Sequence, residues 1–129
     1  MPSKKTLCIL AVETDQSFRR SALISFLQRE GYRVLFARSS GAALALAATG
    51  QCDLVISDTA LTDGNGLNLM QTLKSQHGLK GIAMTNGALA KEIADAKAAG
   101  FDRIVPKPLN EKLLRIAIEE LTAPPPALG

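Results

Sequence analysis

Three charged features follow apolar runs of the chain, and together they could carry out chemistry on an anionic group. Asp58 ends one such run and precedes the turn-rich stretch 59–66. The acids Glu13 and Asp15 follow another run, and Lys107 stands between two prolines after a third. The carboxyl ends of parallel strands meet at one edge of an open α/β sheet, where such sheets bind ligands. We therefore expect these acidic residues and Lys107 to lie close together at one site.

The elements that must position these residues alternate between strand and helix five times. The expected strands are 7–12, 33–37, 53–57, 81–84 and 103–105. The expected helices run from an Asp15 cap to Gly31, from Ser39 or Ser40 to Thr49, from Leu67 to about Gln76, from Ala90 to Ala99, and from an Asn110 cap to Leu121. Single helices between successive strands predict a parallel sheet with right-handed crossovers. We therefore predict an α/β flavodoxin-like (βα)5 fold, a doubly wound parallel sheet with strand order 2-1-3-4-5.

Helical spacing of apolar residues predicts which side of each helix faces the sheet. In the first helix this side comprises Phe18, Ala22, Phe26 and Leu27. In the last helix it comprises Leu113, Leu114, Ala117, Ile118 and Leu121. The fourth helix, 90–99, is so poor in large apolar residues that we expect it to be the least firmly packed.

The size and composition indicate one domain. The 129 residues include 47% hydrophobic residues with one Tyr and no Trp, which suits helices packed on a parallel sheet. We expect the domain to span 1–122, followed by a proline-rich tail over 123–129 that is compatible with a linker or a free terminus. Cys8 and Cys52 are too few for a disulfide scaffold and are expected to be reduced core thiols.

Membrane and nucleic-acid partners are not expected. No apolar run approaches the ~20 residues that span a bilayer, and the run after Lys4 and Lys5 is too short for a signal peptide. We therefore expect a cytoplasmic protein. The net charge is +3, but the basic residues are scattered, with no run longer than two, so direct nucleic-acid binding is not expected.

The charged residues and their spacing are similar to those of a known family. From 14 to 58 is 44 residues, from 85 to 107 is 22, and Gly66 lies eight residues after Asp58. On these spacings, and on Glu13-Thr14-Asp15, Thr85 and Lys107-Pro108, the chain resembles receiver domains of two-component response regulators. The resemblance extends from about residue 7 to residue 121. The residue sequences of 81–85 and 99–102 are most like those of receiver domains in hybrid histidine kinases.

The resemblance implies a phosphorelay role for the predicted site. Asp58 takes the place of the phosphoacceptor, Thr85 that of the switch hydroxyl, and Lys107 that of the lysine that stabilises the phosphoryl group. The implied metal is Mg2+, held by Glu13, Asp58 and the backbone carbonyl of Ala60. A cation is physically required, because a dianionic phosphoryl donor must approach a carboxylate. Mg2+ prefers oxygen ligands, usually including one or two carboxylates.

Two positions depart from the family pattern. Thr14 stands where the family usually has an Asp that ligates the metal, so we expect weak Mg2+ binding. Ile104 stands where the family usually has an aromatic residue or His, so the inward and outward swing of an aromatic side chain is not available to this switch position. The resemblance implies output through a face formed by the fourth helix, the fifth strand and the fifth helix.

Two functions follow from this pattern. The first is a phosphoacceptor receiver domain, which takes a phosphoryl group from a histidine kinase or phosphotransfer protein onto Asp58. Its self-catalysed transfer would not make it a conventional enzyme. The alternative is a pseudo-receiver, a protein-binding module with weak or no phosphorylation. A flavodoxin-like cofactor binder is disfavoured, because no glycine-rich loop follows the first strand.

Each candidate residue also has a purely structural interpretation. Asp58 could cap the loop that follows it, and Thr85 could be an ordinary turn hydroxyl. Lys107 could be a solvated lysine, and Glu13 could be a surface acid that binds nothing. The three-dimensional arrangement of these side chains distinguishes the alternatives.

Overall fold

The computed structural model describes residues 7–13, 21–61, 64–86 and 90–122 of the chain. Its strands are β1 (Cys8–Val12), β2 (Arg33–Ala37), β3 (Leu54–Asp58), β4 (Ala60–Leu61), β5 (Gly64–Asn65), β6 (Lys80–Thr85) and β7 (Arg103–Pro106). Its helices are α1 (Ala22–Arg29), α2 (Ser40–Ala47), α3 (Gly66–His77), α4 (Ala90–Ala99) and α5 (Glu111–Thr122). The predicted alternation of five strands and five helices is confirmed.

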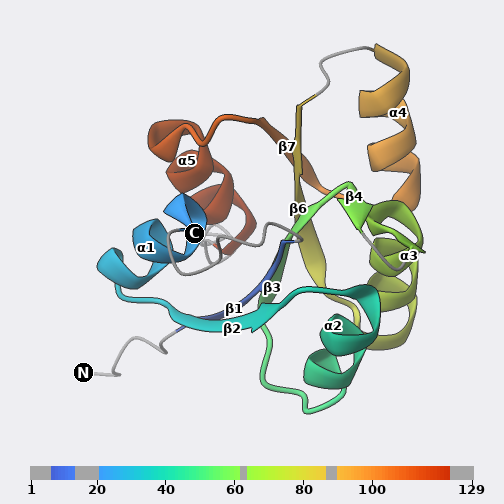
Figure 1. Cartoon of the computed structure of the whole chain (residues 1–129), viewed down its shortest axis with the longest axis horizontal. Helices are drawn as coiled ribbons and strands as arrows, with labels where there is room; N and C mark the ends of the chain where they lie inside the picture. Colours follow the sequence, from blue (N-terminus) through green and yellow to red (C-terminus); the bar gives the residue numbers. More distant parts are fainter. Residues whose placement is uncertain (1–6, 14–20, 62–63, 87–89, 123–129) are drawn as a thin grey trace, which may run out of the picture.

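The main sheet is parallel, with the order β2-β1-β3-β6-β7, which is the predicted order 2-1-3-4-5 for the five principal strands. Helices α1 and α5 lie on one side of the sheet, and α2, α3 and α4 lie on the other (Figure 1). A short antiparallel pair, β4 with β5, follows β3 and was not predicted. The fold is therefore the expected doubly wound sheet with one added hairpin.

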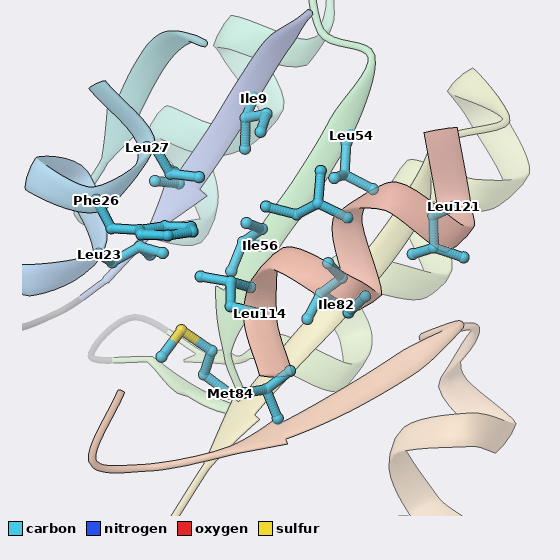
Figure 2. Close-up of a cluster of buried hydrophobic side chains, with 14 residues drawn as sticks. Ile9, Leu23, Phe26, Leu27, Leu54, Ile56, Ile82, Met84, Leu114 and Leu121 are labelled. Atoms are coloured by element: carbon cyan, nitrogen blue, oxygen red, sulfur yellow. The ribbon is translucent and has the colours of Figure 1, made fainter. Parts of the chain in front are cut away.

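The face of the sheet under α1 and α5 forms one of two apolar cores. Strand residues alternate between the two faces, so Ile9, Leu54, Ile56 and Ile82 all point into this core (Figure 2). Phe26 of α1 and residues of α5 pack against them. The central strands β1 and β3 are buried along their whole length because helices cover both of their faces.

The second core lies under α2, α3 and α4. It contains the alternate residues of the same strands, including Leu10 and Val55, together with Met70 and Leu73 of α3. Gly81 leaves room for Met70, since a Cβ built at that position would overlap the Met70 sulfur. Burial on both faces specifies the strand register, because a slip of one residue would exchange the two faces.

Some details of the helices differ from the sequence predictions. Helix α1 is capped by Ser21, whose Oγ accepts the Ile24 N–H, and the predicted cap Asp15 lies outside the described residues. Ala22 and Leu113 were expected to face inward, but both are exposed. Ser39 caps α2, and the Asn110 side chain accepts the Leu113 N–H as the predicted cap of α5. Predicted helix faces were thus wrong at first-turn positions.

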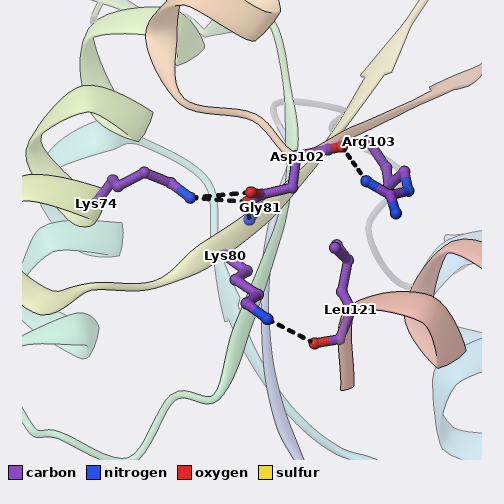
Figure 3. Close-up of polar contacts among 6 residues, drawn as sticks. All are labelled: Lys74, Lys80, Gly81, Asp102, Arg103 and Leu121. Carbon is purple, nitrogen blue, oxygen red and sulfur yellow. Dashed lines mark hydrogen bonds and ion pairs between the residues drawn. The ribbon is translucent and has the colours of Figure 1, made fainter. Parts of the chain in front are cut away.

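The C-terminal end of α4 is tied to the rest of the fold by Asp102. The Asp102 carboxylate pairs with Lys74 of α3 at 2.9 Å and accepts the backbone N–H of Gly81 at 2.9 Å (Figure 3). Ala99 and Phe101 beside it are buried. The N-terminal half of α4 is exposed at most positions, so the helix is held mainly at its C-terminal end.

The two cysteines are free thiols, as expected. Burial raises the pKa of the Cys52 thiol to about 11, with smaller contributions from Cys8 and Asp53, so this thiol is protonated at neutral pH. Among the described residues, no helix combines the length and apolar character that crossing a membrane requires.

Candidate phosphoacceptor site

The strand register brings the predicted acids to the same level of the sheet. Val12 of β1 is paired with Ser57 of β3, so Glu13 and Asp58 are the next residues on neighbouring strands. Asp58 is paired on its other side with Met84 of β6. The site therefore begins at the carboxyl edge of the sheet, where the sequence placed it.

Asp58 is a buried carboxylate with a cationic partner. Its exposed fraction is 6%, and the Lys107 ammonium lies 2.5 Å from its Oδ1. Lys107 follows β7, which is separated from β3 by β6, so the ion pair spans three strands of the sheet. A buried charge is costly unless it is paired, and this pair supplies the compensation that Asp58 needs. The interpretation of Lys107 as an ordinary solvated lysine is therefore wrong.

Main-chain hydrogen bonding holds Lys107 in place. The Lys107 N–H donates to the carbonyl oxygen of Thr85 at 2.8 Å, one step beyond the Thr85–Pro106 pairing of β6 and β7. The backbone thus places the lysine and the threonine next to each other at the strand ends. Because this bond is between main-chain atoms, it fixes the point from which the Lys107 side chain reaches Asp58.

Glu13 is also buried, with an exposed fraction of 9%, so it is not a surface acid. The Ser21 hydroxyl lies 3.0 Å and 3.1 Å from the two carboxylate oxygens of Glu13 and donates to them. Sequence analysis missed Ser21 as a site residue. The available signal is a serine directly before an apolar helical pattern, whereas the sequence prediction places the cap at Asp15.

Glu13, Asp58 and Lys107 line one open cavity of about 300 Å³. The remaining lining residues described by the structure are Ser21, Ala22, Leu23, Met84, Pro108 and Leu109. Two carboxylates and an ammonium thus face a common space large enough for a phosphoryl group and several waters. An anionic group entering it meets the ammonium directly, and a cation meets the two carboxylates.

Thr85 is not among the described residues that line this cavity, but it lines two other hollows. One, of about 470 Å³, is formed by α4 and β7 and is bordered by Ile93, Lys97 and Ile104. The other, of about 150 Å³, is bordered by Thr59 and by Glu92 and Asp95 of α4. Thr85 therefore connects the strand end that carries Lys107 with the space under α4.

Gly66 allows the chain to return close to Asp58. Its N–H donates to the carbonyl oxygen of Thr59 at 2.9 Å. A Cβ at position 66 would overlap the carbonyl oxygen of Asp58 and would lie 3.0 Å from the Cα of Thr59. Only glycine permits this approach, which explains why a glycine stands eight residues after the acid.

The residues of this cavity could hold Mg2+, although they offer only a small number of ligands. Among the described residues, no group of three or more Asp, Glu, His or Cys side chains could hold a metal ion. Glu13 and Asp58 nevertheless supply two carboxylates to one cavity, which is within the usual number for Mg2+. Ala60 is paired through its backbone with Asn65 in the short hairpin. Thr14 lies outside the described residues, and its effect on the metal stays a prediction.

The fold and this edge of the sheet define a class of protein. A (βα)5 sheet of order 2-1-3-4-5 with a buried Asp at the end of its central strand, a Lys on that Asp and a second acid in the same cavity is the architecture of receiver domains. Comparison with known proteins agrees, because the family model for the response regulator receiver domain matches residues 9–119. The chain belongs to this family.

Curated relatives are similar over nearly the whole chain. The sensor histidine kinase AruS of Pseudomonas aeruginosa is 32% identical over 134 residues, which cover 98% of this chain and 13% of AruS. The KDP operon transcriptional regulatory protein KdpE of Escherichia coli is 31% identical, over 92% of this chain and 55% of KdpE. The chain thus spans only part of the length of these relatives.

Solved structures of receiver domains have the same fold. The non-phosphorylated HemR receiver domain of Leptospira biflexa has a TM-score of 0.80 at 28% identity, covering 96% of this chain and 100% of that one. A signal receiver domain from Pseudomonas fluorescens has a TM-score of 0.82 at 28% identity, covering 91% of this chain and 94% of that one. These comparisons support a receiver and lend no support to the pseudo-receiver alternative.

The close approach at Gly66 leads to a testable prediction. We expect Gly66→Ala to lower the free energy of unfolding by about 3 kcal/mol in urea, because the obstacle is backbone. The amide NMR signals of Thr59 and Lys107 should also move, since the Asp58 carbonyl must shift. Gly81→Ala is the matched control: its Cβ meets the Met70 side chain, so it should destabilise without moving these two signals. Unchanged Thr59 and Lys107 signals in a folded Gly66→Ala would contradict this account.

Proposed function

We propose that this domain accepts a phosphoryl group on Asp58 from a phosphohistidine donor. The observation that carries the proposal is the buried Asp58 carboxylate paired with Lys107 in a cavity that also contains Glu13. Membership of the receiver family supports the same role. The proposal includes the site residues Asp58, Lys107, Thr85 and Glu13.

In the proposed transfer, an Asp58 carboxylate oxygen forms a bond to phosphorus. The bond from phosphorus to the donor imidazole nitrogen breaks, and its electron pair stays on the imidazole. The product is an acyl phosphate on Asp58. Lys107 neutralises Asp58 before transfer and then pairs with a phosphoryl oxygen, so its charge is used in both states. The Thr85 hydroxyl, from the neighbouring strand end, donates to another phosphoryl oxygen.

A divalent cation completes the charge balance of this proposal. Glu13, Asp58 and the Ala60 carbonyl would hold Mg2+, which when bound offsets the repulsion between the donor phosphoryl group and the two acids. Thr14 supplies no carboxylate, so the proposed binding is weak. A carboxylate at position 14 would add one unit of negative charge to the same metal site.

The proposed partners are proteins. Receiver domains receive their phosphoryl groups from histidine kinases or phosphotransfer proteins, and one similar structure is the Saccharomyces cerevisiae complex of Ypd1 with the receiver domain of Ssk1. Similarity to AruS, named as a sensor histidine kinase, is compatible with a place in a kinase relay. Direct nucleic-acid binding is not part of the proposal, and a cytoplasmic location stays a prediction.

For output we propose the face formed by α4, β7 and α5. This face contains the hollow of about 470 Å³ beside Ile104, and Thr85 reaches it from the phosphoacceptor edge. The exposed apolar side chains Leu113 and Ile116 of α5 are 44% and 43% exposed and are available to a partner protein. Phosphorylation would act on this face through Thr85.

The assignment of the acceptor can be tested with Asp58→Asn. We expect this variant to fold and to lose covalent phosphorylation completely, because the nucleophile is removed at nearly constant volume. Lys107 is 32% exposed and can be rehydrated, so stability should change by about 1 kcal/mol only. Phosphate incorporation from acetyl phosphate with Mg2+ is measured by intact-protein mass spectrometry.

Asp53→Asn is the control for that experiment. Asp53 precedes the other end of β3, where its carboxylate accepts the Cys8 N–H. This variant should still gain one phosphoryl group. An acid-stable, base-labile phosphate on Asp58→Asn would place the acceptor elsewhere.

The metal proposal predicts that Thr14→Asp tightens Mg2+ binding roughly tenfold, since one additional carboxylate attracts the ion. It should also increase phosphoryl uptake by Asp58. Calorimetric titration with Mg2+ measures the affinity, and Thr49→Asp, an equal charge change on an exposed residue after α2, is the control. Equal or poorer affinity in Thr14→Asp would count against this placement of the metal site.

The switch proposal concerns the segment 85–99. Ile104 has no aromatic ring to swing, and α4 is anchored at its C-terminal end, so activation should rearrange this segment while Ile104 keeps its rotamer. We expect amide shifts from Thr85 into α4 on addition of beryllofluoride and Mg2+, and little change at Gly81, whose N–H is bound by Asp102. If beryllofluoride saturates the site and the amide signals in the described part of 85–99 do not shift, the switch proposal is wrong and a pseudo-receiver is favoured.

A further inference from the structure

The Ser21 hydroxyl joins the start of a helix to an acid of the candidate site. Its oxygen accepts the N–H of Ile24 at 3.2 Å, which makes it the N-cap of α1. Its hydrogen points to the Glu13 carboxylate, whose two oxygens lie at 3.0 Å and 3.1 Å. One side chain thus uses both its acceptor and its donor capacity.

Both partners of this contact are removed from solvent. The exposed fractions are 8% for Ser21 and 9% for Glu13, and both residues line the cavity that contains Asp58 and Lys107. A buried carboxylate without a donor is costly, so the serine hydroxyl stabilises the charged form of Glu13 where it stands. A serine that only capped α1 would not need to lie beside Glu13.

The equal distances also determine the orientation of the carboxylate. A donor equidistant from both oxygens occupies the space between them, while an ionised carboxylate has about four lone-pair sites. Glu13 also lines the cavity that a cation would enter. Glu has one more rotatable bond than Asp, so a fixed donor removes freedom that would otherwise weaken metal binding.

We propose that Ser21 is a positioning residue for Glu13, which holds its carboxylate ready for Mg2+ and couples the metal site to the first turn of α1. This inference rests on the proposed function, because Glu13 acts there as a metal ligand. Ser21 itself does not touch the metal or the phosphoryl group. Residues that orient a metal ligand through a hydrogen bond commonly affect metal affinity by tenfold or more.

Three substitutions separate the two roles of Ser21. Ser21→Thr retains both the cap and the donor. Ser21→Gly retains most of the capping, because Gly costs only a few tenths of a kcal/mol relative to Ser at an N-cap, but it removes the donor. Ser21→Ala removes both. Ser39→Ala is the matched control, since Ser39 caps α2 in the same way, accepting the Ala42 N–H at 3.1 Å.

The measurement is a calorimetric Mg2+ titration of each unphosphorylated chain, with urea unfolding in parallel. We expect Ser21→Gly and Ser21→Ala to weaken Mg2+ binding by roughly tenfold. Ser21→Thr should bind as the parent chain does. Ser39→Ala also loses a helix cap, so it should be destabilised, although less than Ser21→Ala, but it should keep the parent Mg2+ affinity. Loss of stability alone would instead weaken Mg2+ binding in both variants.

The outcomes distinguish this inference from the proposed function. Parent-like affinity in both Ser21→Gly and Ser21→Ala, with normal phosphorylation of the parent chain, would overturn the positioning role alone. Weaker binding in Ser39→Ala equal to that of Ser21→Ala would also overturn it, since loss of stability would then explain both. A parent chain that neither binds Mg2+ nor becomes phosphorylated would overturn the proposed function and this inference together.

Discussion

The site depends on keeping a charged carboxylate buried in the centre of the sheet. Asp58 is 6% exposed at the end of β3, and the hydrophobic environment of the neighbouring strands offers its charge little solvation. The Lys107 ammonium compensates for this, at 2.5 Å from Oδ1. Because Lys107 is partly exposed, its own desolvation cost is smaller than that of a fully buried partner. The pair can therefore exist at rest and still be opened by a competing anion.

This ion pair in turn requires an accurate register across the sheet. Asp58 ends β3 and Lys107 follows β7, and β6 lies between these two strands. The main-chain hydrogen bond from Lys107 to Thr85 fixes the position of Lys107 relative to β6. The two apolar cores enforce the register, since each strand residue fits only one face. Core packing far from the cavity thus determines whether the charges meet.

Sequence reasoning was most successful where hydrophobic pattern and strand ends decide the structure. The runs before Glu13 and Asp58 are buried on both faces, so these two strands could be predicted from continuous apolar runs. The order of the strands followed from the alternation of strands and helices. Ser21 could not be ranked above Asp15 from the sequence, because Ser and Asp are both good N-cap residues. The β4–β5 hairpin was missed because two-residue strands give no periodic signal. Leu113 was placed inward from spacing, but at the start of α5 it is exposed.

The attachment of α4 indicates where the fold can respond to a change at Asp58. Ala96, Ala99 and Phe101 are buried, and Asp102 is held by Lys74 and by the Gly81 amide, so the C-terminal end of α4 is bound to two other elements. At the other end, residues 90–92 are exposed, as is typical of the less stable parts of a fold. A hollow of about 470 Å³ lies between α4 and β7 and is lined by Ile93 and Ile104. In the proposed switch, a change at Thr85 would therefore act on the N-terminal half of α4, because the C-terminal end of the helix is the part that is buried and tied to its neighbours.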